Sequence, residues 1–176
     1  MPLSSVQAGR IGEFLLAVYA MLTTDGALVP FQVDADDDHR DLVVAVKGRS
    51  AFASLQAKTA FQVDGAGFVH ANAIYFEDSV PIDAGWIYVV LLMIGMAPVK
   101  WWCIPAPDFN RLVSHTPVGG GRQVELHFHA SPDREDAAAP FRVETHDLGA
   151  RLLKLIDALP AATKPLPGAR LVLTRR

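Results

Sequence analysis

Residues 41–59 read DLVVAVKGRSAFASLQAKT, and this stretch decides the expected fold. Two β-rich runs flank a Gly-Arg-Ser turn, so the pattern predicts a β-hairpin. Side chains at alternate positions of a strand share a face, so Gln56 and Lys58 are expected to point the same way. A hairpin also brings the start of its first strand toward the end of its second. We therefore expect Asp41 to lie near this pair.

The rest of the chain supplies helices and strands around this hairpin. Ile11–Leu22 (IGEFLLAVYAML) is apolar except for Glu13 and has helical spacing, which predicts a buried helix with one charge. Trp86–Ile94 (WIYVVLLMI) is typical of a central strand covered on both faces. The weakly patterned segment before it suggests a short helix at His70–Phe76. Further strands are expected at Leu28–Val33, Asp41–Lys47, Ala51–Thr59, Pro98–Ile104 and Val124–Ala130, with a short helix after Pro107 and a closing helix at Asp147–Leu159. This order predicts an α/β or α+β sheet with helices packed on its faces.

The composition indicates a globular chain. Its 176 residues are 51% hydrophobic and 20% charged, which excludes disordered and low-complexity classes. We expect a single domain at 1–160 and a basic C-terminal tail at 161–176. No apolar run approaches the roughly 20 residues needed to span a bilayer, and we see no secretory signal. The single cysteine, Cys103, allows no internal disulfide and fits a cytoplasmic location.

Charge is distributed unevenly along the chain. The net charge is -3, but residues 1–150 hold 10 Lys/Arg against 18 Asp/Glu, and residues 151–176 hold 6 against 1. The basic end either contacts nucleic acid or an acidic partner, or is a solubilising terminus. The acidic remainder excludes a sequence-blind DNA coat, because that function needs a broad positive surface.

Three polar motifs in the first 60 residues carry a resemblance to a known family. They are GRIGEFLL with Glu13, DDDHRDLVV with Asp41, and SLQAKTA with Gln56 and Lys58. A helical glutamate, an acid and a Q-x-K pair in this order resemble the PD-(D/E)xK nuclease superfamily, in the branch where glutamine replaces the second acid. The resemblance implies a restriction-endonuclease-like α-β-β-β-α-β core, with a mixed sheet flanked by helices. Arg40 stands where the family name has proline, and the helix after the third strand is only faintly visible.

The resemblance also implies a role for each residue. Asp41, the side-chain oxygen of Gln56 and the backbone carbonyl of Ala57 would ligate Mg²⁺ or Mn²⁺, with Glu13 bound directly or through water. Lys58 would orient and help deprotonate the attacking water, or stabilise charge on the scissile phosphate. The implied activity is metal-dependent phosphodiester hydrolysis by a DNA endonuclease-like protein of defence, repair or mobile elements. A neutral glutamine supplies one charge fewer than an acid, which predicts a weak or inactive site.

Two other interpretations stay open at this point. In the first, Glu13, Asp41, Gln56 and Lys58 form a buried charge network without metal, and the protein is a catalytically inactive interaction module on the same fold. In the second, the protein is a structural subunit that needs a partner. A homodimer would favour the nuclease interpretation, because it would bring together basic side chains that one acidic chain lacks.

Overall fold

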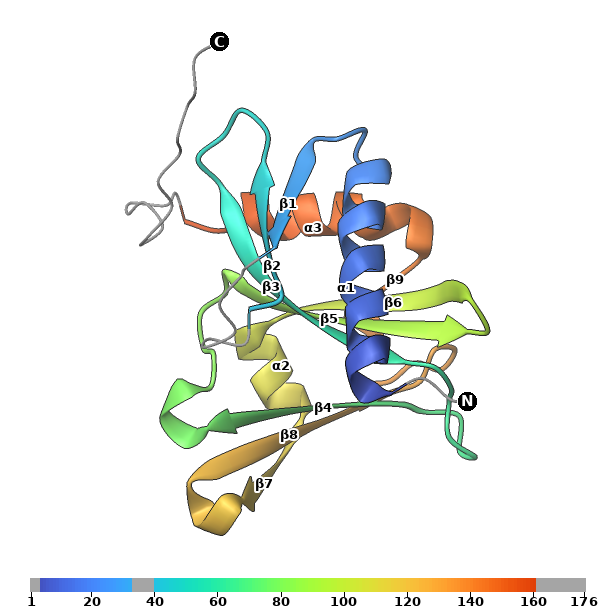
Figure 1. Cartoon of the computed structure of the whole chain (residues 1–176), viewed down its shortest axis with the longest axis vertical. Helices are drawn as coiled ribbons and strands as arrows, with labels where there is room; N and C mark the ends of the chain where they lie inside the picture. The colour runs from blue at the N-terminus through green and yellow to red at the C-terminus, as the bar shows by residue number, and fades with distance from the viewer. Residues whose placement is uncertain (1–3, 33–39, 161–176) are drawn as a thin grey trace.

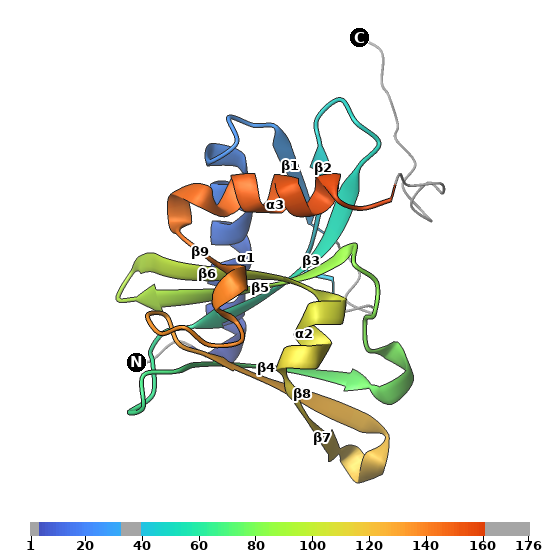
Figure 2. The ribbon, with the colours of Figure 1, turned by 180° about the vertical axis from the view of Figure 1, so that it is seen from behind.

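The structure is a computed structural model that describes residues 4–32 and 40–160. Its strands form two sheets (Figures 1 and 2). The larger sheet contains, in spatial order, β1 (Leu28–Gln32), β2 (Leu42–Val46), β3 (Phe52–Ala60), β5 (Trp86–Ile94), β6 (Ala97–Pro105) and β9 (Arg142–Val143). Its β3 and β5 are parallel and its other neighbours are antiparallel, so the sheet is mixed.

Two hydrophobic cores lie between three layers, which are a helical layer, the larger sheet, and a smaller sheet with one helix. The smaller sheet contains β4 (Val69–Phe76), β8 (Gln123–Ala130) and β7 (Ser114–Val118), and the helices are α1 (Ser5–Leu22), α2 (Ala106–Leu112) and α3 (Leu148–Asp157). One core joins α1 and α3 to one face of the larger sheet. The other joins the opposite face to the smaller sheet and α2. The expected mixed α/β fold, with a mixed sheet flanked by helices, is confirmed.

Strand β5 lies at the centre of the larger sheet, as its sequence predicts. Every residue from Trp86 to Met93 is buried, because α1 and α3 cover one face and the smaller sheet and α2 cover the other. The neighbouring strand β6 places Trp101 in the first core and Trp102 in the second, both fully buried. Adjacent residues of a strand point to opposite faces, so one tryptophan anchors each core.

Helix α1 begins at Ser5, and Ser4 before it forms a capping box that fixes the first turn. The backbone N–H of Gln7 donates to Ser4 Oγ at 3.2 Å, and that of Ser4 donates to Gln7 Oε1 at 2.9 Å. The helix therefore extends ahead of the apolar run Ile11–Leu22. It packs closely on β3 at Gly12, where an added Cβ would overlap Thr59 Oγ1.

The helix expected at His70–Phe76 is wrong, because this segment is strand β4. Its side chains alternate strictly between buried and exposed from Val69 to Phe76, which is the period of a strand and not of a helix. Between β3 and β5 the chain therefore passes through the smaller sheet, followed by a 3-10 turn at Glu77–Ser79. Strand β4 thus stands where the resemblance implied the second helix.

No helix among residues 4–32 and 40–160 is long and apolar enough to cross a bilayer. The basic tail at 161–176 and the end of the strand expected at Leu28–Val33 lie outside the described residues.

Candidate active site

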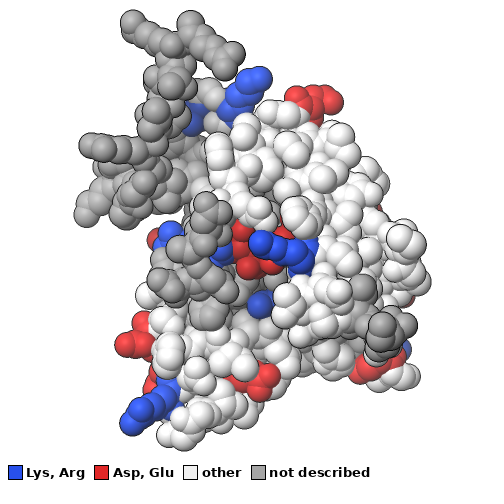
Figure 3. All heavy atoms as spheres, in the orientation of Figure 1, with Lys and Arg blue, Asp and Glu red and all other residues white. Residues whose placement is uncertain are grey.

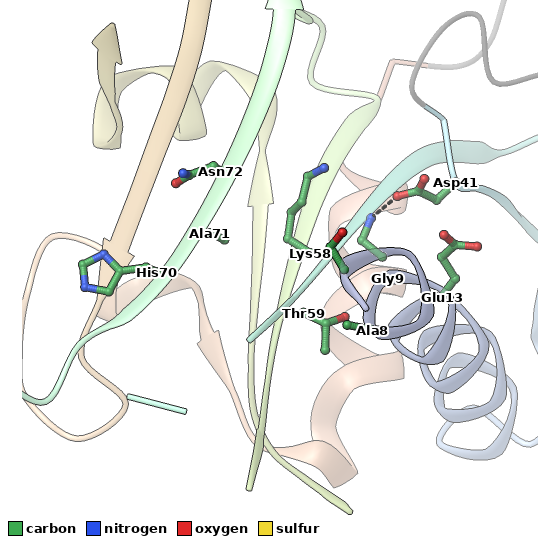
Figure 4. Close-up of a pocket in the computed structure, with 11 residues that line it drawn as sticks. Ala8, Gly9, Glu13, Asp41, Lys58, Thr59, His70, Ala71 and Asn72 are labelled. Carbon is green, nitrogen blue, oxygen red and sulfur yellow. Dashed lines mark hydrogen bonds between the residues drawn. The ribbon is translucent and has the colours of Figure 1, made fainter. Parts of the chain in front are cut away.

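A pocket of about 430 Å³ lies at the edge of β3, between α1 and β4. Glu13, Asp41 and Lys58 line it (Figure 4), and Ala57 also belongs to its lining. On the face that carries α1, acidic and basic side chains gather around a hollow near the middle of the molecule (Figure 3). The structure therefore brings four of the five predicted site residues to one open pocket.

Asp41 is held at this edge by two hydrogen bonds to β3. Its backbone N–H donates to the Leu55 carbonyl at 3.1 Å, and its Oδ2 accepts from the Ala57 backbone N–H at 2.7 Å. The β2–β3 ladder ends at the pair formed by Leu42 and Leu55, so the Asp41 carboxylate takes the next position along the edge. The N–H and C=O of a strand residue point to the same side, so the Ala57 carbonyl also faces this edge.

Glu13 enters the pocket from α1. Its side chain is 15% exposed, and its Oε2 accepts a hydrogen bond from Arg10 Nη1 at 2.6 Å. The contact between Gly12 and Thr59 brings this part of the helix close to β3. The Glu13 carboxylate points toward the side of the pocket where Asp41 lies (Figure 4). Two acids from distant elements therefore meet at one side of the pocket.

Lys58 and Gln56 share the face of β3 that looks toward β4, but only Lys58 lines the pocket. Gln56 is 3% exposed, and its Oε1 accepts a hydrogen bond from the Tyr75 hydroxyl. The Tyr88 hydroxyl in turn donates to the Tyr75 oxygen at 2.9 Å. The Gln56 oxygen is thus held by a buried pair of tyrosines behind the pocket, and the structure does not bring it to the pocket wall.

Sequence reasoning missed this tyrosine pair. Burial raises the pKa of Tyr88 to about 12. Burial and then the neighbouring Tyr88 raise the pKa of Tyr75, and the negative charge of Asp41 raises it further. Both hydroxyls therefore stay protonated and can donate to an oxygen acceptor. The alternation of VHANAIYF in β4 is the signal that would have placed Tyr75 on the inner face.

The donor set at the pocket is made of oxygen atoms. In the part of the chain that the structure describes, no group of three or more His, Cys, Asp or Glu side chains is placed to hold a metal ion. The Asp41 and Glu13 carboxylates and the Ala57 carbonyl nevertheless meet the requirement of Mg²⁺, which binds one or two carboxylates, keeps several waters and takes further oxygens from substrate phosphates. The residues present fit such a site.

Known proteins resemble this chain in structure. No family model matches the sequence, and no curated protein matches it. A bacterial homing endonuclease superposes with a TM-score of 0.58 at 15% identity, over 86% of this chain and 93% of that one. A Holliday junction resolvase from Archaeoglobus fulgidus, an archaeal hyperthermophile, gives a TM-score of 0.39 at 12% identity, over 76% of this chain and 96% of that one. The first similarity supports a fold of the restriction-endonuclease type.

Proposed function

We propose that the protein is a divalent-metal-dependent nuclease that hydrolyses phosphodiester bonds in DNA. One observation carries the proposal: Glu13, Asp41 and Lys58 reach the same open pocket from three separate elements. A buried structural network would be closed to substrate, whereas this pocket opens on the surface (Figure 3). The fold shared with a homing endonuclease supports the same interpretation.

In this proposal, Asp41, Glu13 and the Ala57 carbonyl hold Mg²⁺ or Mn²⁺. The ion supplies Lewis-acid stabilisation and a more acidic bound water. The hydrogen bond from Ala57 N–H fixes the Asp41 carboxylate on β3 before any ligand arrives. Gln56 completes the Q-x-K variant of the motif. Its oxygen lies behind the pocket wall and accepts from Tyr75, and its second lone pair leaves it able to accept from a water that lies between it and the ion.

Lys58 supplies positive charge opposite the two acids. Its amine lines the pocket, where it can bind a phosphate oxygen or orient the attacking water (Figure 4). Charge developing on the phosphate in the transition state would be stabilised by this ammonium group. Arg10, which binds Glu13 at 2.6 Å, limits the motion of that carboxylate.

The test is cleavage of supercoiled, linear and single-stranded DNA and of RNA, with Mg²⁺, Mn²⁺ or EDTA. Asp41→Asn keeps an oxygen acceptor for the Ala57 N–H but removes the charge, so the fold should survive while the rate falls by about 100-fold or more. Lys58→Met should give a similar loss. Asp157→Asn is the matched control, because it neutralises an exposed acid that is paired with Arg49. Equal rates in Asp41→Asn and Asp157→Asn would refute the proposal.

A second candidate is a nuclease-fold protein that binds a partner without cleaving nucleic acid. Its support is that the Gln56 oxygen already accepts from Tyr75 and the Glu13 carboxylate already binds Arg10. This candidate predicts no cleavage of any substrate and no rise in melting temperature with metal. Metal-dependent cleavage that Asp41→Asn abolishes would exclude it.

We also propose that the protein acts as a homodimer in a cytoplasmic setting of defence, repair or mobile elements. Helix α1 supports a self-contact, because Phe14, Val18 and Leu22 recur at four-residue spacing and are 56%, 42% and 67% exposed. Such an apolar stripe on an exposed helix face is the usual form of a helix-packing surface. Phe14→Glu with Val18→Lys should convert a dimer to a monomer in light scattering. A wild-type protein that is monomeric at assay concentration would contradict this part of the proposal.

A further inference from the structure

Gly9 is a glycine that the described protein does not need for its own packing. It lies inside α1, one turn before Glu13, and it lines the pocket. Its φ angle is not positive, so no special backbone conformation requires glycine there. A Cβ at this position would meet no atom of the described residues within 4 Å. Glycine inside a helix weakens it relative to alanine, so this residue costs stability without a packing reason.

Gly12, three residues later in the same helix, shows the contrast. A Cβ there would overlap Thr59 Oγ1 and come within 3.1 Å of Thr59 Cβ, so packing explains that glycine fully. Gly9 faces the open pocket instead of β3 (Figure 4). A side chain at Gly9 would therefore project into the open pocket and not into the packed interior.

We propose that Gly9 lets the sugar–phosphate backbone of a bound nucleic-acid strand pass over α1 in contact with the helix backbone. This inference rests on the proposed nuclease function and names the path of its substrate. The strand would lie between Gly9 on α1 and the wall that Ala71 and Asn72 of β4 form on the other side of the pocket.

The spacing suits a polymer. Four residues of helix separate Gly9 from Glu13, and at 1.5 Å per residue they span roughly 6 Å along the axis. One strand of duplex DNA advances about 3.4 Å per nucleotide. The backbone that crosses α1 at Gly9 would thus lie within about two nucleotides of the bond held beside Glu13. A side chain at Gly9 would push that strand away from the pocket floor.

The experiment compares Gly9→Ala and Gly9→Leu with the wild type. Because the space around Gly9 is open and both residues favour helix, each variant should melt about 1–4 °C higher than the wild type. Binding of a fluorescent DNA without cleavage, measured with EDTA by anisotropy, should weaken by about threefold for alanine and tenfold or more for leucine. Val6→Leu is the control, because it enlarges an exposed α1 side chain outside the pocket and should leave binding unchanged.

The outcomes separate this inference from the proposed function. Weaker binding together with a higher melting temperature supports the path over Gly9, since a merely damaged fold would melt lower. A wild type that cleaves DNA, with a Gly9→Leu variant that binds and cleaves equally well, overturns the path and leaves the nuclease proposal standing. A wild type that neither binds nor cleaves nucleic acid overturns both.

Discussion

Replacing Gly12 with alanine tests whether the candidate site depends on the close approach of α1 to β3. The added methyl would overlap Thr59 Oγ1, with Thr59 Cβ at 3.1 Å behind it, so either the threonine rotates or the helix moves outward. In an open helix the same change gains about 1 kcal/mol of propensity, as expected at Gly9. Overpacking of a buried contact costs about 1–3 kcal/mol and occasionally more. The overlap at Gly12 is severe, so we take the overpacking cost as about 3 kcal/mol, from which the same propensity gain of about 1 kcal/mol is subtracted. We therefore expect Gly12→Ala to unfold about 2 kcal/mol more easily than the wild type, and about 3 kcal/mol more easily than Gly9→Ala.

Urea unfolding followed by circular dichroism measures these free energies of unfolding, and the rate of DNA cleavage measures the activity of the candidate site. Thr59→Ala provides the rescue, because the Thr59 hydroxyl is buried without a hydrogen-bond partner among the described residues and its removal clears the overlap. Adding Thr59→Ala to Gly12→Ala should recover at least half of the lost stability and most of the lost cleavage, since α1 carries Glu13. The reasoning is refuted if Gly12→Ala is as stable as Gly9→Ala, or if the double variant is no better than the single one.

Three further predictions concern the groups around the pocket. Tyr75→Phe removes the hydroxyl that donates to the Gln56 oxygen, so the amide loses its orientation. The cleavage rate should fall several-fold, and the ratio of the rate in Mg²⁺ to the rate in Mn²⁺ should change, whereas a purely structural role would leave that ratio unchanged. Burial raises the pKa of Tyr88 to about 12 and raises that of Tyr75 as well, so the folded protein retains both protons above pH 10. The stability of the folded protein should therefore fall as the pH rises from 10 through 12, and ultraviolet titration should show two tyrosines ionising only with unfolding. Hydrogen bonding to His70 lowers the pKa of Asp64 from 3.8 to about 2, so the contribution of this carboxylate to folding stability is present above pH 4 and is lost as the pH falls toward 2. Carboxyl NMR should show the Asp64 pKa moving upward in His70→Ala.

The sequence predicts those elements whose pattern is local. The sequence predicts strand β5 with its observed bounds, because nine apolar, β-rich residues need no partner to identify them. The hairpin of β2 and β3 follows from two β-rich runs with a short turn between them, and the structure pairs them as antiparallel neighbours. The sequence predicts a helix where β4 lies, because the inner positions of the strand are filled by small residues, Ala71 and Ala73, which give little hydrophobic contrast with Asn72 between them.

The same division applies to the site. Asp41 and Lys58 converge because hairpin geometry and strand alternation, both local properties, bring them to one edge. The position of Gln56 depends on Tyr75, which is 19 residues away and belongs to a different sheet, so no short-range pattern reports it. The different surroundings of Gly9 and Gly12 also cannot be predicted from the sequence. Only the packing of α1 on β3 shows that Gly12 lies against Thr59 and that Gly9 faces open space.

The charges at the pocket lead to a prediction about when the metal binds. Two acids, Glu13 and Asp41, are accompanied by Lys58 in the same pocket and by Arg10 on the Glu13 carboxylate. The formal charges of these four side chains sum to zero, so together they attract a free divalent ion weakly. A bound phosphate adds negative charge and oxygen ligands, which Mg²⁺ prefers over a fully protein-made cage. We expect calorimetry to show Mg²⁺ affinity at least tenfold higher with a non-cleavable phosphorothioate DNA than without it. Tight Mg²⁺ binding by the protein alone would contradict this, because it would require acidic ligands beyond these two carboxylates.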